Sequence, residues 1–284
     1  MKNGILKKIF DQDFHFFMSI PALMWQVLFF YIPLMFVIAI SFIKTTERAL
    51  AFTLENYHSL LNPIYFIIIA RSFFLAFVTA SLCLLCAYPI AYFIVFKMKR
   101  FKNSMLFFLI LPFWISLLIQ VYAWFFVLEK YGIINRLLIF MGVINEPLPL
   151  LNTPFAIYLV MIYCYLPFMI LPLYTILEKM DRRLIEASLD LGANQEQTFT
   201  RVTLPLSLSG IQTGFFLVFV PSFGEFVIPG LMGGGKQYYV GSLILHYFLI
   251  ARQPFLGAAF TCLSGAFLGL VVYIVYWCFK KISG

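Results

Sequence analysis

Six long apolar tracts, separated by short polar segments, constrain this chain more than any other feature. A transmembrane helix needs about 20 consecutive apolar residues to cross the hydrocarbon layer of a bilayer. The predicted spans are residues 20–43, 64–96, 104–128, 154–177, 206–229 and 255–279. With 63% hydrophobic and 11% charged residues, the composition excludes an ordinary soluble domain. The sequence therefore predicts an all-α membrane protein with six transmembrane helices.

The pattern also predicts the domain organisation. Residues 1–18 are polar and basic with interleaved Phe, so we expect a cytoplasmic amphipathic segment on the membrane surface. Residues 19–284 show no internal repeat and no linker, which indicates a single transmembrane domain. Five of the six tracts carry proline inside or at an edge, at Pro33, Pro89, Pro112, Pro167, Pro172 and Pro221. Kinked helices of this kind suit a bundle around a cavity.

Lysine and arginine gather on one side of the predicted spans. The larger group comprises Lys2, Lys7, Lys8, Lys97, Lys99, Arg100, Lys102, Lys179, Arg182, Arg183, Arg201, Lys280 and Lys281. The smaller group comprises Lys44, Arg48, Lys130, Arg136, Lys236 and Arg252, and Arg71 lies at a helix end. Because cytoplasmic loops carry the excess of basic residues, both termini are predicted to be cytoplasmic. The charge thus sets topology, and no nucleic-acid partner is expected.

The longest polar run between two apolar tracts is Glu186–Pro205, within the loop 178–205 on the predicted cytoplasmic side. Asp181 can cap a first short helix, and Gly192 stands where that helix needs a glycine after its end. Asn194 followed by Gln197 has the spacing of a capping box. These signals predict two short helices joined by a glycine. The apolar side of the first helix must be covered by a partner or pack back on the bundle.

The residues of this loop resemble the EAA loop of ATP-binding-cassette importer permeases. Glu186-Ala187-Ser188, then Gly192, then Val202-Thr203-Leu204-Pro205 follow its spacing, with Ser for the third Ala and Val for Ile. The resemblance implies the MetI-like fold of a type I importer permease, whose cytoplasmic coupling helix docks on an ATPase subunit. The residues that it implies for this docking are Glu186, Ala187, Ser188, Leu191, Gly192 and Ala193.

Further segments resemble the permeases of spermidine and putrescine importers, with a somewhat closer likeness to the putrescine type. They are residues 56–61 (NYHSLL), 112–124 (PFWISLLIQVYAW), 165–174 (YLPFMILPLY) and 224–234 (GEFVIPGLMGG). The likeness extends from about residue 20 to 279. Gly230 is a departure, since the putrescine type often has a second acid there.

The polyamine resemblance also implies partners and a location. It implies a second homologous permease, two cytoplasmic ATP-binding subunits that bind ATP and Mg²⁺, and an extracytoplasmic polyamine-binding protein. The expected location is the lipid bilayer of the bacterial inner membrane.

The sequence argues against catalysis in this chain. It contains no GxxxxGK[ST] phosphate loop, and its three His residues are scattered without a paired carboxylate. The five Cys residues lie in apolar tracts, where they suit small buried hydrophobes better than metal ligands. We therefore expect no enzyme activity, no metal and no cofactor in this chain.

Glu225 is the only one of the twelve acidic residues within a predicted span. A charge in mid-membrane costs about 2.5–3.5 kcal/mol on insertion scales, so it normally faces a cavity or a partner. Gly224, Pro229 and Gly230 are expected to break the helix and free backbone carbonyls, which with the carboxylate would suit an ammonium group. The alternatives are a Glu that merely reaches water near the helix end, or one that pairs with Arg71.

Aromatic residues complete the candidate substrate path. Trp114 sits well inside its span, where the aromatic belt at the membrane surface does not explain it. An aromatic face attracts a cation by about 0.5–2 kcal/mol. Tyr122, Tyr165 and Tyr238 are weaker candidates of the same type. In a chain with 35 Phe and 16 Tyr, the alternative for each is a lipid-facing or core position.

Other functions stay open on the sequence alone. Related permeases that share the EAA loop import other solutes, such as ferric ion, sulfate or an opine. A secondary carrier that acts alone would be expected to show paired inverted repeats, which are not visible. A membrane enzyme would need acid and base pairs, which the chain lacks.

Overall fold

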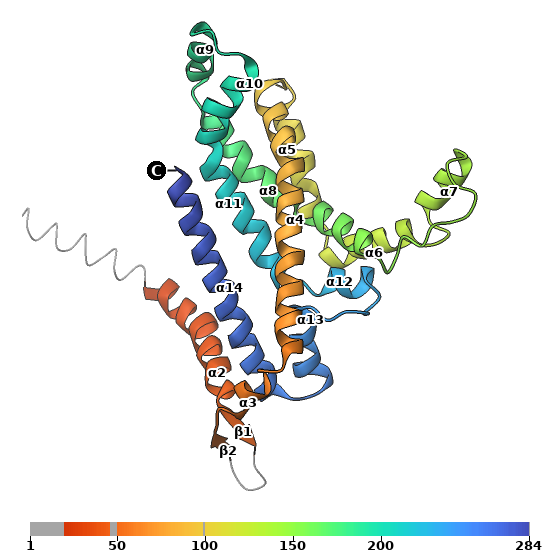
Figure 1. The fold of residues 1–284 in the computed structure, drawn as a ribbon, viewed down its shortest axis with the longest axis vertical. Helices are drawn as coiled ribbons and strands as arrows, with labels where there is room; N and C mark the ends of the chain where they lie inside the picture. Colours follow the sequence, from red (N-terminus) through yellow and green to blue (C-terminus); the bar gives the residue numbers. More distant parts are fainter. Residues whose placement is uncertain (1–19, 46–49, 99, 284) are drawn as a thin grey trace, which may run out of the picture. The chain divides into compact units, whose positions relative to one another are not determined.

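The computed structural model describes residues 20–45, 50–98 and 100–283. The predicted amphipathic segment at residues 1–18 lies outside this range. The described chain forms two compact units, one of residues up to 61 with 246–263, the other of residues 62–245 with 264–284. Figure 1 labels their helices and strands.

The first unit begins with an apolar helical segment, Ile20–Ser41, which agrees with the first predicted span. It contains a wide π-helical turn, η1 (Val27–Tyr31), followed by α2 (Ile32–Ser41). The wide turn lies just before Pro33, which has no N–H to continue the helical hydrogen bonds. The unit also contains β1 (Ile43–Thr45), β2 (Leu50–Phe52), α3 (Glu55–Ser59) and η4 (His246–Ile250).

A small antiparallel hairpin, β1 with β2, was not predicted from the sequence. The amide of Asn56 fixes the chain before it, since Nδ2 donates to the carbonyls of Ser41 and Ile43 at 3.0 and 2.9 Å. The hydroxyls of Ser41 and Tyr57 lie 2.8 Å apart, which joins α2 to α3. Two strands of three residues each give too short a pattern to recognise in a sequence.

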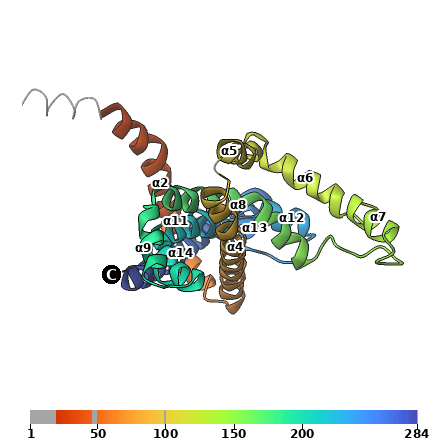
Figure 2. The same ribbon diagram turned by 90° about the horizontal axis from the view of Figure 1, so that it is seen from above.

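Three long helices form the centre of the second unit: α4 (Pro63–Phe96), α8 (Pro154–Lys179) and α11 (Leu204–Phe223). They lie side by side in both views of the ribbon (Figures 1 and 2). One side of α4 carries fully buried small residues at intervals of three or four, namely Ala76, Ala80, Cys83, Ala87 and Ala91. Small side chains let membrane helices approach closely.

Two glycines of α11 make the same kind of approach to α8. An added Cβ at Gly214 would meet the sulfur of Met169 at 2.7 Å, and one at Gly210 would meet Cβ of Ile176 at 3.1 Å. In α4, Cys83 lies with its sulfur 3.9 Å from the carbonyl of Ile162 in α8. The second and fourth predicted spans are single helices, α4 and α8. The sixth is also a single helix, α14 (Pro254–Ser283).

The prediction of one continuous helix over residues 104–128 was wrong. The chain forms α5 (Lys102–Ile110) and a 3₁₀ turn, η2 (Leu111–Trp114), and the extended backbone at Ile115 and Ser116 then separates these from α6 (Leu117–Leu128). Helix α7 (Ile133–Phe140) follows, and Leu117–Phe140 is the segment long and apolar enough to cross a membrane. Figure 2 shows α5 and α6 running in different directions.

The break is stabilised by Gln120, whose side-chain amide donates to the carbonyls of Pro112 and Ile115 at 2.5 and 3.0 Å. Pro112 supplies no N–H, so a continuous helix would already lack one hydrogen bond there. The side chain of Gln120 thus supplies these two carbonyls with the hydrogen bonds that backbone N–H groups would donate in a continuous helix.

The fifth predicted span, residues 206–229, was also wrong at its end. Helix α11 stops at Phe223, and a turn through Glu225 leads to the short helix α12 (Val227–Met232). The break therefore lies at Gly224, one of the three expected helix breakers, whereas Pro229 and Gly230 lie within α12. The remaining helices of this unit are α9 (Arg182–Asp190), α10 (Gln195–Thr198), η3 (Phe199–Thr203) and α13 (Val240–Leu245).

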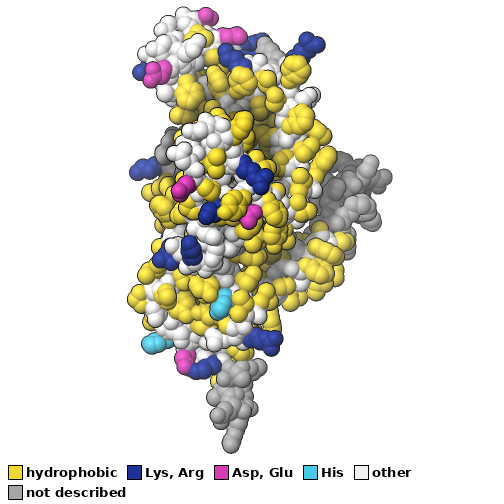
Figure 3. Space-filling model, turned by 90° about the vertical axis from the view of Figure 1, so that its right-hand side faces the viewer, with side chains coloured by type: hydrophobic (Ala, Val, Ile, Leu, Met, Phe, Trp, Pro, Cys, Tyr) yellow, Lys and Arg dark blue, Asp and Glu magenta, His cyan; other side chains and the backbone are white. Residues whose placement is uncertain are grey.

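Hydrophobic side chains form extensive areas on the face drawn in Figure 3, with charged side chains scattered between them. Exposed large apolar residues occur along α2, α4 and α6. Such surfaces are stable against lipid or another membrane subunit, and they agree with the six apolar segments found in the described residues.

Candidate functional site

The loop between α8 and α11 has the helix–glycine–helix form that the sequence predicted. The carboxylate of Asp181 accepts a hydrogen bond of 3.0 Å from the N–H of Arg183 and so caps α9. Gly192 has a φ of +87°. The N–H groups of Gly192 and Ala193 donate to the carbonyls of Leu189 and Ser188 at 2.9 and 3.1 Å, which is a Schellman ending.

The second short helix, α10, begins with the predicted capping box. Oδ1 of Asn194 accepts from the N–H of Gln197 at 2.8 Å, and Oε1 of Gln197 accepts from the N–H of Asn194 at 3.1 Å. The hydroxyls of Ser188 and Thr198 lie 3.0 Å apart and join α9 to α10. The two helices are thus held to each other around Gly192.

Helix α9 has a half-buried side and an exposed side, and apolar residues occur on both. Ile185 and Ser188 are half-buried, whereas Leu184, Ala187 and Leu191 are exposed and follow each other at helical spacing. The side chain of Leu191 is 90% exposed. The sequence left open whether the apolar side packs back on the bundle or meets a partner, and this arrangement permits both at once. Glu186 is also exposed, and Ala193 is half-buried.

Contacts that the sequence did not predict attach this loop to the end of α4. Arg182 donates from Nη2 to the carbonyl of Val95 at 3.0 Å, and its guanidinium lies 5.6 Å from the ring centre of Phe96. The ring of Phe199 meets that of Tyr88 edge-on at 5.5 Å. A displacement of α9 would therefore pull directly on α4.

An ion pair between Lys102 and Glu178 joins the start of α5 to the end of α8. The hydrogen bond to Glu178 raises the pKa of the Lys102 ammonium above its ordinary value. The same ammonium lies 5.5 Å from the ring centre of Tyr174. Both partners are partly exposed, so this contact orients the two helices more than it stabilises them.

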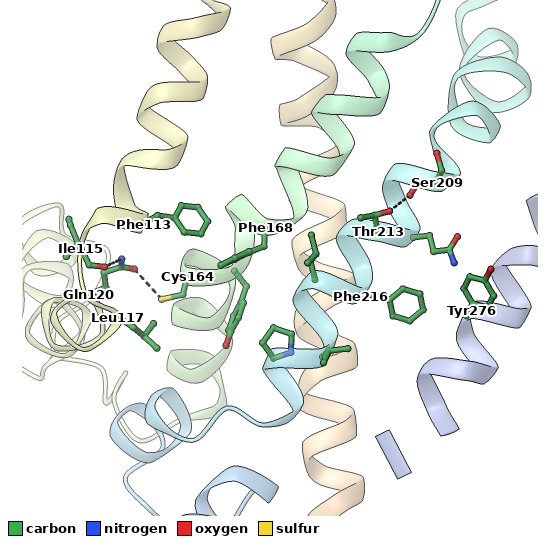
Figure 4. Close-up of a pocket in the computed structure, with 15 residues that line it drawn as sticks. Phe113, Ile115, Leu117, Gln120, Cys164, Phe168, Ser209, Thr213, Phe216 and Tyr276 are labelled. Atoms are coloured by element: carbon green, nitrogen blue, oxygen red, sulfur yellow. Dashed lines mark hydrogen bonds between the residues drawn. The ribbon is translucent and has the colours of Figure 1, made fainter. Parts of the chain in front are cut away.

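The second unit has a cavity of about 1110 Å³ between η2, α6, α8, α11 and α14 (Figure 4). Its aromatic lining consists of Phe113, Tyr165, Phe168, Phe216 and Tyr276, and its polar lining includes Gln120, Ser209, Gln212 and Thr213. The rings of Phe113 and Phe168 meet edge-on at 4.6 Å. Among the described residues that line this cavity, none is acidic or basic.

Glu225 lies directly behind this cavity, in the turn between α11 and α12. Its Oε2 accepts a hydrogen bond of 2.7 Å from the hydroxyl of Tyr165, a cavity residue. Its Oε1 accepts from the N–H groups of Phe226 and Val227 at 3.0 and 2.9 Å. The carboxylate thus caps the first turn of α12, a role that the sequence analysis did not predict.

The carboxylate is enclosed, since Glu225 is only 7% exposed. Within the part of the chain that the structure describes, no ion pair joins Glu225 to Arg71. Burial of an unpaired carboxylate is costly, and here hydrogen bonds from backbone and hydroxyl donors compensate for lost water. A negative charge is therefore held next to the cavity wall with Tyr165 between it and the hollow.

The other predicted path residues lie apart from this cavity. Trp114 is 74% exposed, with its ring edge-on to Phe107 at 5.9 Å. Tyr122 on α6 and Tyr238 before α13 are also exposed. Of the five predicted residues, the structure thus brings together only Tyr165 and Glu225.

Sequence reasoning missed most of the cavity wall. In a chain with 35 Phe, no signal separates Phe168 or Phe216 from lipid-facing residues. Gln120 and Gln212 did carry a signal, because each is an uncharged polar residue inside a long apolar tract.

Residues 84–282 match the profile of a protein family described as the inner membrane component of binding-protein-dependent transport systems. This chain belongs to that family. As a member of the family it is an inner-membrane component, and its six apolar segments agree with that location.

Two relatives share the name spermidine/putrescine transport system permease protein PotB. The protein from Salmonella typhimurium (strain LT2) is 38% identical over 256 residues, which covers 89% of each chain. That from Escherichia coli (strain K12) is 37% identical over 263 residues, which covers 92% of this chain and 95% of the relative. The likeness therefore extends through the cavity helices and the coupling loop.

The fold is that of a solved importer. The described residues resemble a chain in the crystal structure of a bacterial alginate ABC transporter in complex with an alginate pentasaccharide-bound periplasmic protein. The TM-score is 0.73 at 17% identity, with 97% of each chain covered. The predicted fold class, an all-α membrane protein with an importer-permease architecture, is confirmed.

Proposed function

We propose that this family member is the transmembrane permease subunit of an ATP-driven importer for polyamines such as putrescine and spermidine. The observation that carries the proposal is the identity of 37–38% to the two PotB proteins over about nine-tenths of the chain. Those relatives are named for spermidine and putrescine transport. The cavity and the coupling loop supply a physical route for that activity.

The aromatic cavity suits a passing organic cation. Aromatic faces attract ammonium groups, and the attraction grows as water is excluded. Because the hydroxyl of Tyr165 donates a hydrogen bond to Glu225, its oxygen lone pairs stay free to accept a hydrogen bond from an ammonium group. The negative charge of Glu225 behind Tyr165 strengthens this interaction. In this proposal Tyr165 contacts the substrate, and Glu225 supplies charge and fixes the ring.

ATP hydrolysis by separate subunits drives the movement of substrate through the cavity. Two cytoplasmic ATP-binding subunits bind ATP and Mg²⁺, and each permease offers one of them its exposed face at Leu184, Ala187 and Leu191. Closure of the ATPase displaces α9, and the bond from Arg182 to Val95 carries the displacement into α4. This chain has no phosphate loop of its own, so it acts as a transport subunit and not as an enzyme.

The remaining partners follow from the same proposal. A second homologous permease encloses the open side of the cavity, and an extracytoplasmic polyamine-binding protein delivers substrate. Both termini and the α9–α10 loop are cytoplasmic, as the distribution of Lys and Arg favours.

The decisive experiment reconstitutes the assembled complex in proteoliposomes with the binding protein present. Uptake of labelled putrescine and spermidine is measured with and without ATP, and unlabelled sulfate, ferric ion and an opine are tested as competitors. We expect ATP-dependent polyamine uptake that the other solutes do not inhibit. Uptake of another solute in preference to polyamines would refute the substrate, and uptake without ATP would indicate an independent carrier. A complex with a hydrolysis-deficient ATPase is the control.

A further inference from the structure

A second cavity in the 62–245 part of the chain surrounds Arg71 on α4. It has a volume of about 620 Å³ and lies between α4, the start of α8 and the segment before α13. Its polar lining consists of Arg71, Tyr158, Gln237 and Tyr239, and apolar side chains make up the rest. Neither the coupling loop nor the aromatic cavity involves these polar groups.

The guanidinium of Arg71 has no counter-charge in the described part of the chain. No carboxylate there forms an ion pair with it, and the side chain is exposed. Arg71 and Tyr239 line the same cavity. Burial raises the pKa of the Tyr239 hydroxyl, and the positive charge of Arg71 partly opposes that shift. An unpaired arginine within a membrane-spanning helix is costly and normally has a partner of opposite charge.

The wall of this cavity is held in place by hydrogen bonds next to Arg71. The hydroxyl of Ser72 accepts from the N–H of Val240 at 2.8 Å, which ties the segment before α13 to α4. The hydroxyl of Ser242 accepts from the N–H of Tyr239 at 2.8 Å. Tyr239 is therefore positioned beside Arg71 by backbone contacts that require no ligand.

Arg71 lies near the level where hydrocarbon meets the headgroups, from which its long side chain can reach the lipid phosphates. At about 1.5 Å per residue, the 34 residues of α4 extend about 51 Å. The hydrocarbon core of a bilayer is about 30 Å thick, so a centred helix extends about 10 Å beyond it at each end. Arg71 lies about 12 Å along the axis from Pro63, where hydrocarbon meets the headgroups.

We propose that this cavity binds the phosphate group of an anionic membrane phospholipid. The planar guanidinium of Arg71 can donate two parallel hydrogen bonds to phosphate oxygens. Tyr239 and Gln237 offer further donors beside it. Ile67 and Phe74 are exposed on the same wall and provide an apolar surface for the acyl chains.

The lining also explains the preference for an anionic headgroup. Of the described residues that form it, none is acidic, so the ammonium of a zwitterionic lipid would find no partner there. A net-negative headgroup such as phosphatidylglycerol needs no such partner.

The test is native mass spectrometry of the full chain and of the assembled complex, titrated with phosphatidylglycerol or phosphatidylethanolamine. We expect phosphatidylglycerol to bind more tightly, and Arg71→Gln to weaken that binding about tenfold through loss of charge-assisted hydrogen bonds. Arg71→Lys, which keeps the charge, should retain part of it. Arg136→Gln changes an exposed arginine on α7 outside the cavity and should bind as the unchanged protein does.

Several outcomes would overturn the proposal. Equal binding of the two lipids, or unchanged phosphatidylglycerol binding in Arg71→Gln, would show that Arg71 selects no anionic headgroup. Full competition by inorganic phosphate would indicate a site for small anions. Loss of lipid binding on assembly of the complex would show that another subunit covers Arg71. If Arg71→Gln fails to fold, the ratio of the two lipids on Arg71→Lys and on the unchanged protein still decides the matter.

Discussion

The hydroxyl of Tyr165 lies 2.7 Å from Oε2 of Glu225 and donates a hydrogen bond to that carboxylate. The contact joins the middle of α8 to the turn after α11, sixty residues later in the chain. Oε2 of Glu225 thereby accepts a hydrogen bond from the cavity wall, while Oε1 accepts hydrogen bonds from the N–H groups at the start of α12. A movement of α8 relative to α11 would change both the cavity and the position of α12.

Replacement of Glu225 by Gln should reduce polyamine uptake about tenfold while the complex still assembles. Gln keeps an oxygen that can accept from the N–H groups of α12, but it removes the negative charge behind Tyr165. The loss corresponds to about 1.4 kcal/mol. Uptake by reconstituted complex, measured over a range of putrescine concentrations, separates weaker binding from slower turnover. Tyr165→Phe is the comparison, since it keeps the charge and removes the donor. Normal uptake by Glu225→Gln would exclude the carboxylate from the path.

Replacement of Gly192 by Val should uncouple ATP hydrolysis from transport. Gly192 has a φ of +87° with open space around it, so the strain comes from the backbone alone and costs about 1–3 kcal/mol. We expect α9 to lose its Schellman ending, so that uptake falls while ATP hydrolysis continues. Gly142→Val is the matched control, because Gly142 has a φ of +69° and equally open surroundings after α7. Equal effects of the two changes would indicate general destabilisation.

The sequence predicted local features well and side-chain assembly poorly. Asp181, Gly192 and Asn194 act through neighbours within a few residues, and their predicted roles as helix signals are confirmed. Their contacts with an ATPase stay predictions. By contrast, the hydrogen bonds from Gln120 to the carbonyls at the break near Ile115 are side-chain contacts, which the hydropathy of that tract does not reveal. Hydropathy shows which residues avoid water, but it does not show whether lipid, protein or a cavity replaces it.

The same limit explains the outcome for the candidate path. The sequence identified Glu225 because a single charge in an apolar tract requires partners, but it did not identify those partners. Its actual partners lie in the turn after it and on α8, and the spacing of the residues does not reveal them. Trp114 stood out by its depth in a predicted helix that is in fact interrupted beside it.

Replacement of Leu191 by Glu should weaken the attachment of the ATPase subunit. Leu191 is 90% exposed at the end of α9, and a charge buried there by a docked subunit would have no partner. We expect the amount of ATPase retained on the purified permease to fall about tenfold or more. Leu61→Glu changes an exposed leucine outside the coupling loop and should retain the normal amount. Undiminished retention by Leu191→Glu would place the docking surface elsewhere.

Replacement of Gln120 by Ala should destabilise the junction between η2 and α6. The change leaves the carbonyls of Pro112 and Ile115 without their side-chain donor, and an unsatisfied polar group costs about 1–3 kcal/mol. We therefore expect a lower midpoint of thermal unfolding for the purified permease. Gln212→Ala is the control, since Gln212 lines the same cavity from α11 and forms none of these bonds to the junction. Because Phe113 lies within this junction and contacts Phe168, the Gln120 variant should also alter polyamine uptake. Matching midpoints for the two variants would mean that the proline and the extended backbone maintain the break without help from Gln120.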